Sequence, residues 1–148
     1  MKKLFTALFV IAACNPLIGW AQDDSPVGLW KNIDDHSGKP RALIRIVEQG
    51  NELNGRIEKL FLEPGEDQHP KCDKCEGALK DQPTLGMTIL SGFTKIDAEY
   101  KNGMILDPEN GKLYKSKMTL SEDGKKLTVR GYIGIPLFGR SQTWIREQ

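Results

Sequence analysis

The chain has 148 residues, of which 28% are charged and 39% hydrophobic, and 21 Lys and Arg residues nearly balance 20 Asp and Glu residues. This length indicates one domain that is large enough for a hydrophobic core of its own. The near-neutral balance argues against a general nucleic-acid binder, since such proteins carry an excess of Lys and Arg. The sequence has no block of like charge that would predict a disordered tail.

Residues 1–21 have the pattern of a secretory signal peptide. Lys2 and Lys3 precede an apolar run over 4–13, and Gly19-Trp20-Ala21 offers a small-x-small cleavage site. Cleavage after Ala21 would leave residues 22–148 as a single domain. It would remove two Lys and no acid, so 19 basic residues would face 20 acidic ones, a formal charge of −1. We therefore predict an exported protein, periplasmic or extracellular.

The same leader has a second interpretation. Ile11-Ala12-Ala13-Cys14 resembles a bacterial lipobox, in which the Cys becomes the lipidated first residue of the processed chain. The apolar run continues past Cys14 to the site at Ala21, which favours ordinary cleavage. Both interpretations predict export and differ in whether a lipid anchors the protein. After the leader no apolar run approaches the roughly 20 residues that span a bilayer, so we predict no transmembrane segment.

Turn signals recur at short intervals along the rest of the chain, among them Gly50-Asn51, Asn110-Gly111 and Asp123-Gly124. Between these turns hydrophobic and polar residues alternate, which predicts antiparallel strands with one buried face. The expected strands cover residues 28–33, 41–48, 52–61, 86–90, 93–98, 103–106, 112–120, 125–133 and 140–146. No stretch predicts a crossover helix. We therefore expect an all-β fold, an antiparallel up-and-down barrel of about eight strands, rather than a sandwich, which needs longer connections.

One connection, residues 63–83, is long and almost free of apolar residues. A loop of this length is commonly a lid, a binding loop or a disordered segment. It also has room for one helical turn near residues 77–81. It also carries Cys72 and Cys75, the pair that remains once Cys14 is set aside. In an exported chain such a pair most often forms one disulfide.

The spacing His69-x-x-Cys72-x-x-Cys75 also permits a metal site made of one imidazole and two thiolates. A single CxxC is a weak zinc signal, and an oxidising compartment favours the disulfide. We therefore expect the disulfide, with the metal site as the alternative, and we predict no cofactor. A thioredoxin-like redox role would need a βαβ setting that this chain lacks.

Two segments at opposite ends of the domain complement each other. Gly28-x-Trp30 opens the first expected strand and Arg146 lies in the last, and in a closed barrel these two strands are neighbours. We expect Trp30 to close the barrel floor and Arg146 to stack on it through a cation–π contact, with Gly28 permitting close approach. A Gly-x-Trp opening with a cation in the final strand resembles the lipocalin and wider calycin pattern.

A more specific resemblance covers most of residues 25–146. The blocks SPVGLW at 25–30, CDKC at 72–75, KDQPTLGM at 80–87, ILDPENGKLY at 105–114 and RGYIGIPLFGRSQTW at 130–144 resemble the domain-of-unknown-function 2147 family. The resemblance implies an exported bacterial protein with a lipocalin-like barrel. It brings no catalytic residue set with it.

The barrel interior is the remaining candidate site, because eight strands leave room for side chains or one small ligand. Alternation places an inward set that we expect to divide between core and cavity: Trp30, Ile44, Ile46, Leu53, Ile57, Tyr114, Met118 and Leu127. Arg130 and Tyr132 share a face, and if that face is inward they offer polar anchors for an acidic ligand group. The apolar residues 135–138 at an expected hairpin tip either pack under the barrel or form an exposed patch that touches a membrane or partner.

The sequence contains little that would indicate an enzyme. The chain lacks a Gly-x-Ser-x-Gly elbow and a His-Glu-x-x-His motif, and its two His residues, His36 and His69, lie in polar loops. We expect a non-enzymatic protein that binds or carries a small apolar or amphipathic molecule in the barrel mouth. The alternative is an envelope protein whose barrel is filled and whose loops bind another protein of unknown identity.

Overall fold

The computed structural model describes residues 24–147. The predicted signal peptide at 1–21 and the alternative lipidation site at Cys14 lie outside the described residues. The predicted domain 22–148 corresponds to the described part apart from its outermost residues.

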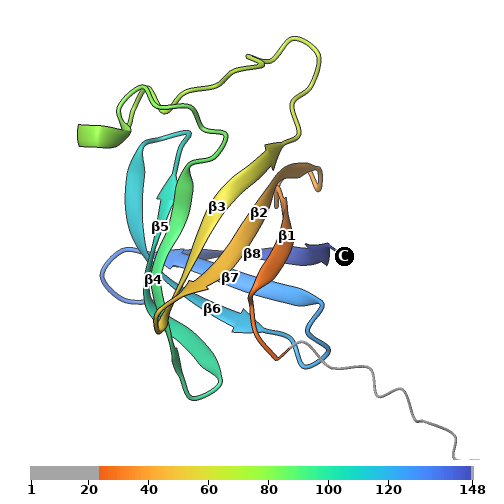
Figure 1. Ribbon diagram of the computed structural model, residues 1–148, viewed down its shortest axis with the longest axis vertical. Coiled ribbons are helices and arrows are strands. Elements are labelled where there is room, and N and C mark those ends of the chain that lie inside the picture. Colours follow the sequence, from red (N-terminus) through yellow and green to blue (C-terminus); the bar gives the residue numbers. More distant parts are fainter. Residues whose placement is uncertain (1–23, 148) are drawn as a thin grey trace, which may run out of the picture.

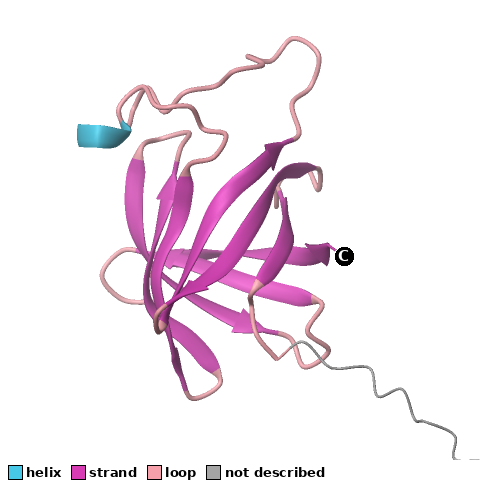
Figure 2. Cartoon of the chain, in the orientation of Figure 1, coloured by secondary structure: helices cyan, strands magenta, loops and turns pink. Residues whose placement is uncertain are grey.

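Eight antiparallel strands form a closed barrel in which each strand pairs with the next one and the last pairs with the first (Figures 1 and 2). They are β1 (Gly28–Ile33), β2 (Pro40–Gln49), β3 (Glu52–Leu60), β4 (Thr88–Ile96), β5 (Glu99–Asp107), β6 (Lys112–Leu120), β7 (Lys126–Tyr132) and β8 (Gly139–Glu147). A single 3-10 turn, η1 (Gly77–Leu79), lies in the long connection between β3 and β4, near the expected residues 77–81. The predicted up-and-down barrel is confirmed.

The two strands expected at 86–90 and 93–98 are one strand, β4. A register shift lies between the pairs Leu53–Phe93 and Gly55–Leu90, and Gly92 in between has a φ of 73°. Because of this bulge, Leu90 and Phe93 are both fully buried although they are three residues apart. The bulge interrupts the alternation of buried and exposed residues, so the sequence pattern predicts two strands where the structure has one.

The neighbouring strand β5 begins four residues earlier than the expected 103–106, at Glu99. It too has a register shift, between Tyr100 and Gly103, with Asn102 at a φ of 62°. The bulge turns Tyr100 and Gly103 to the same side. A Cβ on Gly103 would lie 2.4 Å from the Phe93 ring, so the glycine provides the space in which that ring packs.

The barrel floor has the geometry that the sequence predicts. Trp30 and Arg146 are register partners across the seam between β1 and β8, and Trp30 is fully buried. The Trp30 indole N–H donates to the Pro26 carbonyl at 2.7 Å. The Arg146 guanidinium lies so close to Gly28 that a Cβ there would be 2.8 Å from Nη1. Gly28 is therefore required for the close approach, as expected.

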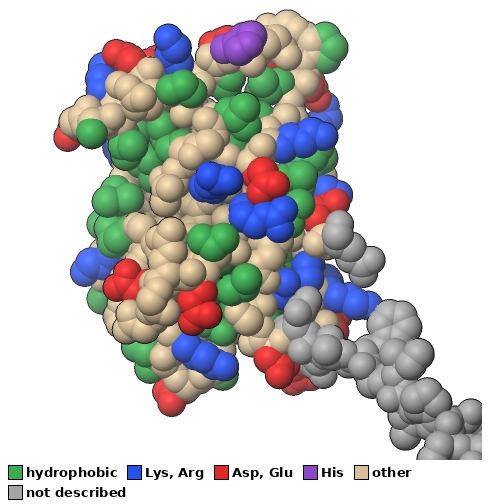
Figure 3. Space-filling view, in the orientation of Figure 1, with side chains coloured by type: hydrophobic (Ala, Val, Ile, Leu, Met, Phe, Trp, Pro, Cys, Tyr) green, Lys and Arg blue, Asp and Glu red, His purple; other side chains and the backbone are tan. Residues whose placement is uncertain are grey.

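Above the floor, the lower half of the barrel is filled by side chains. Those with an exposure of 0 or 1% include Trp30, Ile46, Leu90, Phe93, Met118 and Leu127. On the face seen in Figure 3, acidic and basic side chains are interspersed along the barrel wall. Ion pairs such as Arg45–Glu58 (2.8 Å) join neighbouring strands on the outer surface. No helix among residues 24–147 is long and apolar enough to cross a membrane.

Candidate functional site

The end of the barrel opposite the floor holds a cavity of about 840 Å³. It is lined by the upper parts of the strands, by the β1–β2, β5–β6 and β7–β8 turns, and by the connection 61–87 between β3 and β4. The turns at the floor end do not contribute to it. The barrel is thus filled in its lower half and hollow at its mouth.

Apolar and polar side chains both line the cavity. Its apolar side chains come from strands all around the barrel and include Ala42, Ile44, Ile57, Leu60, Ile89, Ile105, Val129 and Trp144. Gly131 also lines the wall, and a Cβ there would lie 3.2 Å from the Ile105 side chain. These apolar side chains favour burial of an apolar group through the hydrophobic effect.

A small polar group lies in the wall at the seam between β1 and β8. The Asn32 amide donates to the Gln142 side-chain oxygen at 2.9 Å, and the Trp144 indole N–H approaches the same oxygen at 3.3 Å. All three residues line the cavity. The Asn32 oxygen and the Gln142 amide nitrogen have no hydrogen-bond partner among residues 24–147, so an acceptor and a donor remain for a ligand.

The rim of the cavity is charged. Arg41 forms ion pairs with Glu109 and, at 3.9 Å, with Glu66, and Arg140 pairs with Asp35. These contacts join the first residues of β2 and β8 to loops that are far apart from them in the sequence. The hydrogen bond from Arg140 lowers the pKa of Asp35 below its ordinary value. Asp35 is therefore held in its charged form beside Arg140.

Asp34, at the start of the β1–β2 turn, also lines the mouth. Its carboxylate accepts hydrogen bonds from the backbone N–H groups of Ser37 and His36, at 2.7 and 2.9 Å, and these lower its pKa. His36 also lines the mouth, and its backbone rather than its imidazole makes this contact. The two residues fix the shape of the turn.

The long connection 61–87 covers one side of the mouth, and a disulfide holds its central part together. Cys72 and Cys75 are joined with an S–S distance of 1.99 Å and are 0 and 3% exposed. Backbone bonds Cys72 N to Gln82 O (2.9 Å) and Thr84 N to Pro70 O (2.9 Å) close the surrounding loop. The predicted disulfide is present, and both sulfurs are engaged in it rather than available as thiolates beside His69.

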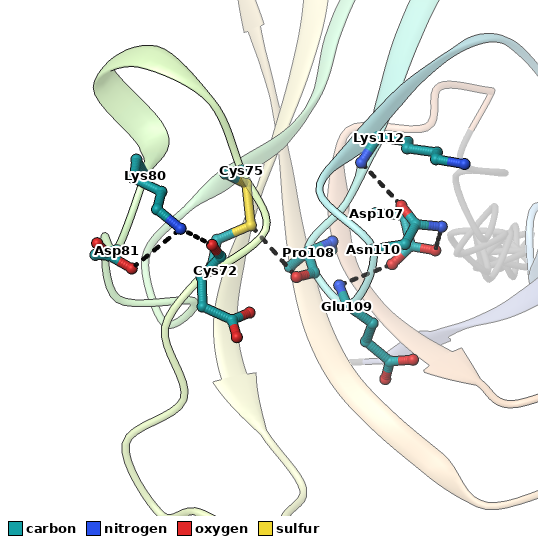
Figure 4. Close-up of a disulfide and its surroundings, with 10 residues drawn as sticks. Cys72, Cys75, Lys80, Asp81, Asp107, Pro108, Glu109, Asn110 and Lys112 are labelled. Carbon is teal, nitrogen blue, oxygen red and sulfur yellow. Dashed lines mark hydrogen bonds and ion pairs between the residues drawn. A yellow bond between two sulfur atoms is a disulfide. The ribbon is translucent and has the colours of Figure 1, made fainter.

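This disulfide loop lies directly against the β5–β6 turn (Figure 4). The Cys72 sulfur is 3.3 Å from the Pro108 carbonyl oxygen. A Cβ on Gly111, whose φ is 71°, would lie 2.1 Å from the Lys74 carbonyl oxygen. The contact therefore depends on a glycine at the tip of the opposing turn.

The sequence-predicted ligand residues divide by depth. Ile44, Ile57, Tyr114 and Tyr132 line the cavity. Three more, Trp30, Ile46 and Met118, belong to the filled lower half, at 0, 1 and 0% exposure. Leu53 and Leu127, also in the expected inward set, are buried core residues.

Arg130 does not line the cavity. It lies on the outer face of β7, since the buried positions of that strand are Leu127 and Val129. Its guanidinium donates to the carbonyl oxygens of Pro136 (2.7 Å) and Leu137 (3.4 Å) and to the Ser141 hydroxyl (2.9 Å). It therefore supports the β7–β8 turn instead of serving as an anchor inside the barrel.

Sequence reasoning missed the polar pair Asn32 and Gln142. The signal was present, because Asn32 follows Trp30 by two residues and Gln142 precedes Trp144 by two, which places both on the inward face. Among the described residues, no group of three or more His, Cys, Asp and Glu side chains is placed to hold a metal ion.

A closed eight-stranded antiparallel barrel with a filled floor, a Trp–Arg closure and a hollow mouth defines a lipocalin-like protein. A solved structure titled "Protein HP1028 from the human pathogen Helicobacter pylori belongs to the lipocalin family" is similar to this chain, with a TM-score of 0.71 over 84% of each chain. The two sequences are 16% identical, so the likeness concerns the fold.

The chain belongs to the family described as "Uncharacterized protein conserved in bacteria (DUF2147)", whose model matches residues 28–146. The resemblance seen in the sequence is thereby confirmed. The comparison with curated proteins finds no match.

Proposed function

We propose that the protein binds a small apolar or amphipathic molecule in the mouth of its barrel. The observation that carries this proposal is the cavity of about 840 Å³, which lies within the size range of roughly 300–1,000 Å³ typical of ligand sites. Its apolar side chains would accept a hydrocarbon or ring system, and its charged rim would contact a polar end. The alternative function requires a barrel that is filled along its whole length. A hollow of this size argues against that alternative.

The Asn32–Gln142 pair supports a ligand with at least one polar group near its buried end. The pair offers one acceptor and one donor beside Trp144. A hydroxyl or amide matches both. A purely hydrocarbon ligand would leave these groups without partners, which costs free energy.

The proposed role is binding without catalysis. The two arginines of the rim are each paired with a carboxylate, in Arg41–Glu109 and Arg140–Asp35. We propose further that the protein acts outside the cytoplasm, from the leader pattern over 1–21. Sequencing the N-terminus of protein from its own cells tests this: Gln22 indicates ordinary cleavage, a lipidated Cys14 indicates an anchor, and an intact Met1 contradicts export.

The first test of binding is native mass spectrometry of protein isolated from its own cells, followed by solvent extraction. We expect an excess mass that is lost on denaturation and recovered in the extract. A clean unliganded mass under gentle conditions, together with no binding of the extracted cell lipids and metabolites, would contradict the proposal.

A matched pair of variants on β5 locates the bound molecule. Ile105 lines the cavity, whereas Met104 is the adjacent residue and is not among its lining residues. We expect Ile105→Trp to weaken binding by about tenfold or more, because the indole occupies space in the mouth, and Met104→Trp to leave it unchanged. Equal effects of both substitutions would place the ligand elsewhere.

A further inference from the structure

The turn between β7 and β8, residues 133–138, forms an exposed apolar tip. Its sequence is Ile-Gly-Ile-Pro-Leu-Phe, which contains no polar side chain. Ile133, Ile135, Leu137 and Phe138 are 70, 54, 75 and 68% exposed. In Figure 1 this turn projects from the barrel wall at the left of the view. Four large apolar side chains so close together on a surface mark an interaction site.

Four of the backbone carbonyls of the tip are satisfied from within the protein. The carbonyl oxygens of residues 135–138 all accept hydrogen bonds: two from Arg130, one from the Phe138 N–H at 3.1 Å and one from the Ile133 N–H at 3.1 Å. Backbone acceptors that lack partners prevent a segment from entering an apolar medium, because nothing there replaces water. The tip avoids this cost at each of these four carbonyls.

Positive charge lies behind the tip. The Arg130 guanidinium donates to two carbonyl oxygens and a hydroxyl, all neutral, so none of these partners offsets its charge. The exposed Lys115 of β6 is the register partner of Tyr132, directly below the tip.

We propose that the apolar tip docks on a lipid bilayer that contains anionic lipids. Apolar side chains that enter the interface, with cations behind them that meet anionic headgroups, are the two contributions that hold a peripheral protein on such a surface. A protein partner fits less well. Protein interfaces carry roughly one hydrogen bond per 100–200 Å², whereas this tip has no side-chain donor or acceptor and its carbonyls of residues 135–138 are in use.

The position of the tip relates the docking to ligand transfer. Ile133 and Phe138 also line the cavity, so the apolar surface of the tip continues into the mouth. A docked barrel has its mouth beside the bilayer, and a ligand of the proposed kind passes between the two along these side chains. This consequence rests on the proposed binding function, whereas the docking does not.

Vesicle flotation tests the docking, with phosphatidylcholine vesicles compared with vesicles that also contain phosphatidylglycerol. Ile135 and Leu137 do not line the cavity, so the double variant Ile135→Ser/Leu137→Ser changes the tip and leaves the mouth intact. We expect the wild type to float with the anionic vesicles, less so at high salt, and the double variant to lose about tenfold or more in partitioning. Leu85→Ser, which replaces a 55% exposed leucine in another loop, should behave as the wild type.

All these proteins carry the same N-terminus, so any contribution of residues 1–23 cancels in the comparison. A second readout reports contact directly. Leu137→Trp places an indole on the tip, while Trp30 and Trp144 are at 0 and 1% exposure. We expect lipids with brominated tails to quench the fluorescence of Leu137→Trp and not that of Leu85→Trp.

Equal flotation of the wild type and the double variant, or absence of quenching at position 137, would overturn the proposal. If a cross-linker at position 137 reacts in cells with one protein and the tip shows no lipid contact, the surface belongs to a protein partner instead. Loss of flotation in the double variant with unchanged ligand binding would separate docking from the proposed binding function. A thermal melt of each variant confirms that it is folded.

Discussion

The guanidinium carbon of Arg146 lies 4.3 Å from the centroid of the Trp30 ring, across the seam where the last strand meets the first. The same guanidinium donates to the carbonyl oxygens of Gly124 (2.6 Å), Val27 (2.9 Å) and Ser25 (2.7 Å). One side chain thus links the β6–β7 turn, the segment before β1 and the floor tryptophan. Its planar, forked shape allows it to do so, and a lysine lacks that shape.

Replacing this arginine should destabilise the whole barrel. We expect Arg146→Met to lower the free energy of unfolding by about 3 kcal/mol, since it removes three hydrogen bonds and the cation–π contact. Arg146→Lys should recover only part of the loss. Urea unfolding measures the change, with Arg45→Met as the control, whose exposed ion pair with Glu58 is expected to contribute less than about 1 kcal/mol. Equal losses at both positions would show that the floor has no special role.

The Phe93–Gly103 contact should be sensitive to a single methyl group. We expect Gly103→Ala to cost about 2 kcal/mol or more, because the new Cβ would lie 2.4 Å from the Phe93 ring. Phe93→Leu in the same chain should return part of that stability, so that the two changes are not additive in a double-mutant cycle. Gly131→Ala serves as control, since its new Cβ would lie 3.2 Å from Cγ2 of Ile105, a much wider spacing than 2.4 Å.

The disulfide loop should stabilise the mouth more than the barrel. Its small ring predicts that Cys72→Ser/Cys75→Ser lowers global stability by about 2 kcal/mol at most. Hydrogen exchange in the β5–β6 turn should increase, because the loop packs on that turn. Gly111→Ala should produce the same increase with the disulfide intact, since the new Cβ would clash with the Lys74 carbonyl. Unchanged exchange in both variants would show that the loop is not held by this contact.

We expect the stability of the barrel to change with pH in the acidic range because of Glu99. Its hydrogen bonds with Lys117 and Lys101 lower its pKa from 4.5 to about 2. Since the folded-state pKa is below the unfolded one, the stabilisation is complete above about pH 4.5 and is lost as the pH falls towards 2. The difference in unfolding free energy between wild type and Glu99→Gln should therefore shrink over this range. High salt should reduce it at every pH, because the group is exposed to solvent.

The sequence predicts the barrel well because most strands are regular. Where β4 and β5 have bulges, strict alternation fails, and the sequence suggests two strands for β4 and too short a β5. Gly92 and Asn102 adopt a positive φ at these points, and a single sequence does not show whether a Gly or Asn ends a strand or bends it. The floor was predictable because Gly28, Trp30 and Arg146 each have a distinct physical role there.

The candidate site was predictable only in part. Alternation tells which face of a strand a residue occupies but not its depth along the barrel axis, so Met118 and Tyr114 are equivalent in sequence although one is core and the other lines the mouth. The outward position of Arg130 could not be predicted without the geometry of the β7–β8 turn, whose carbonyls it binds. Depth and turn geometry arise from the closed barrel as a whole.

The seam between β1 and β8 also sets the order of folding events. Within the described chain, every other pairing joins strands that are adjacent in sequence, and the seam alone joins the two ends, as in the bond from Arg146 to Ser25, 121 residues apart. Hairpins form quickly, whereas contacts between distant residues require a large loss of chain entropy before they form. We therefore expect the hairpins to assemble first and the seam to close last. The refolding rate of the barrel should then be limited by the encounter of its two terminal strands.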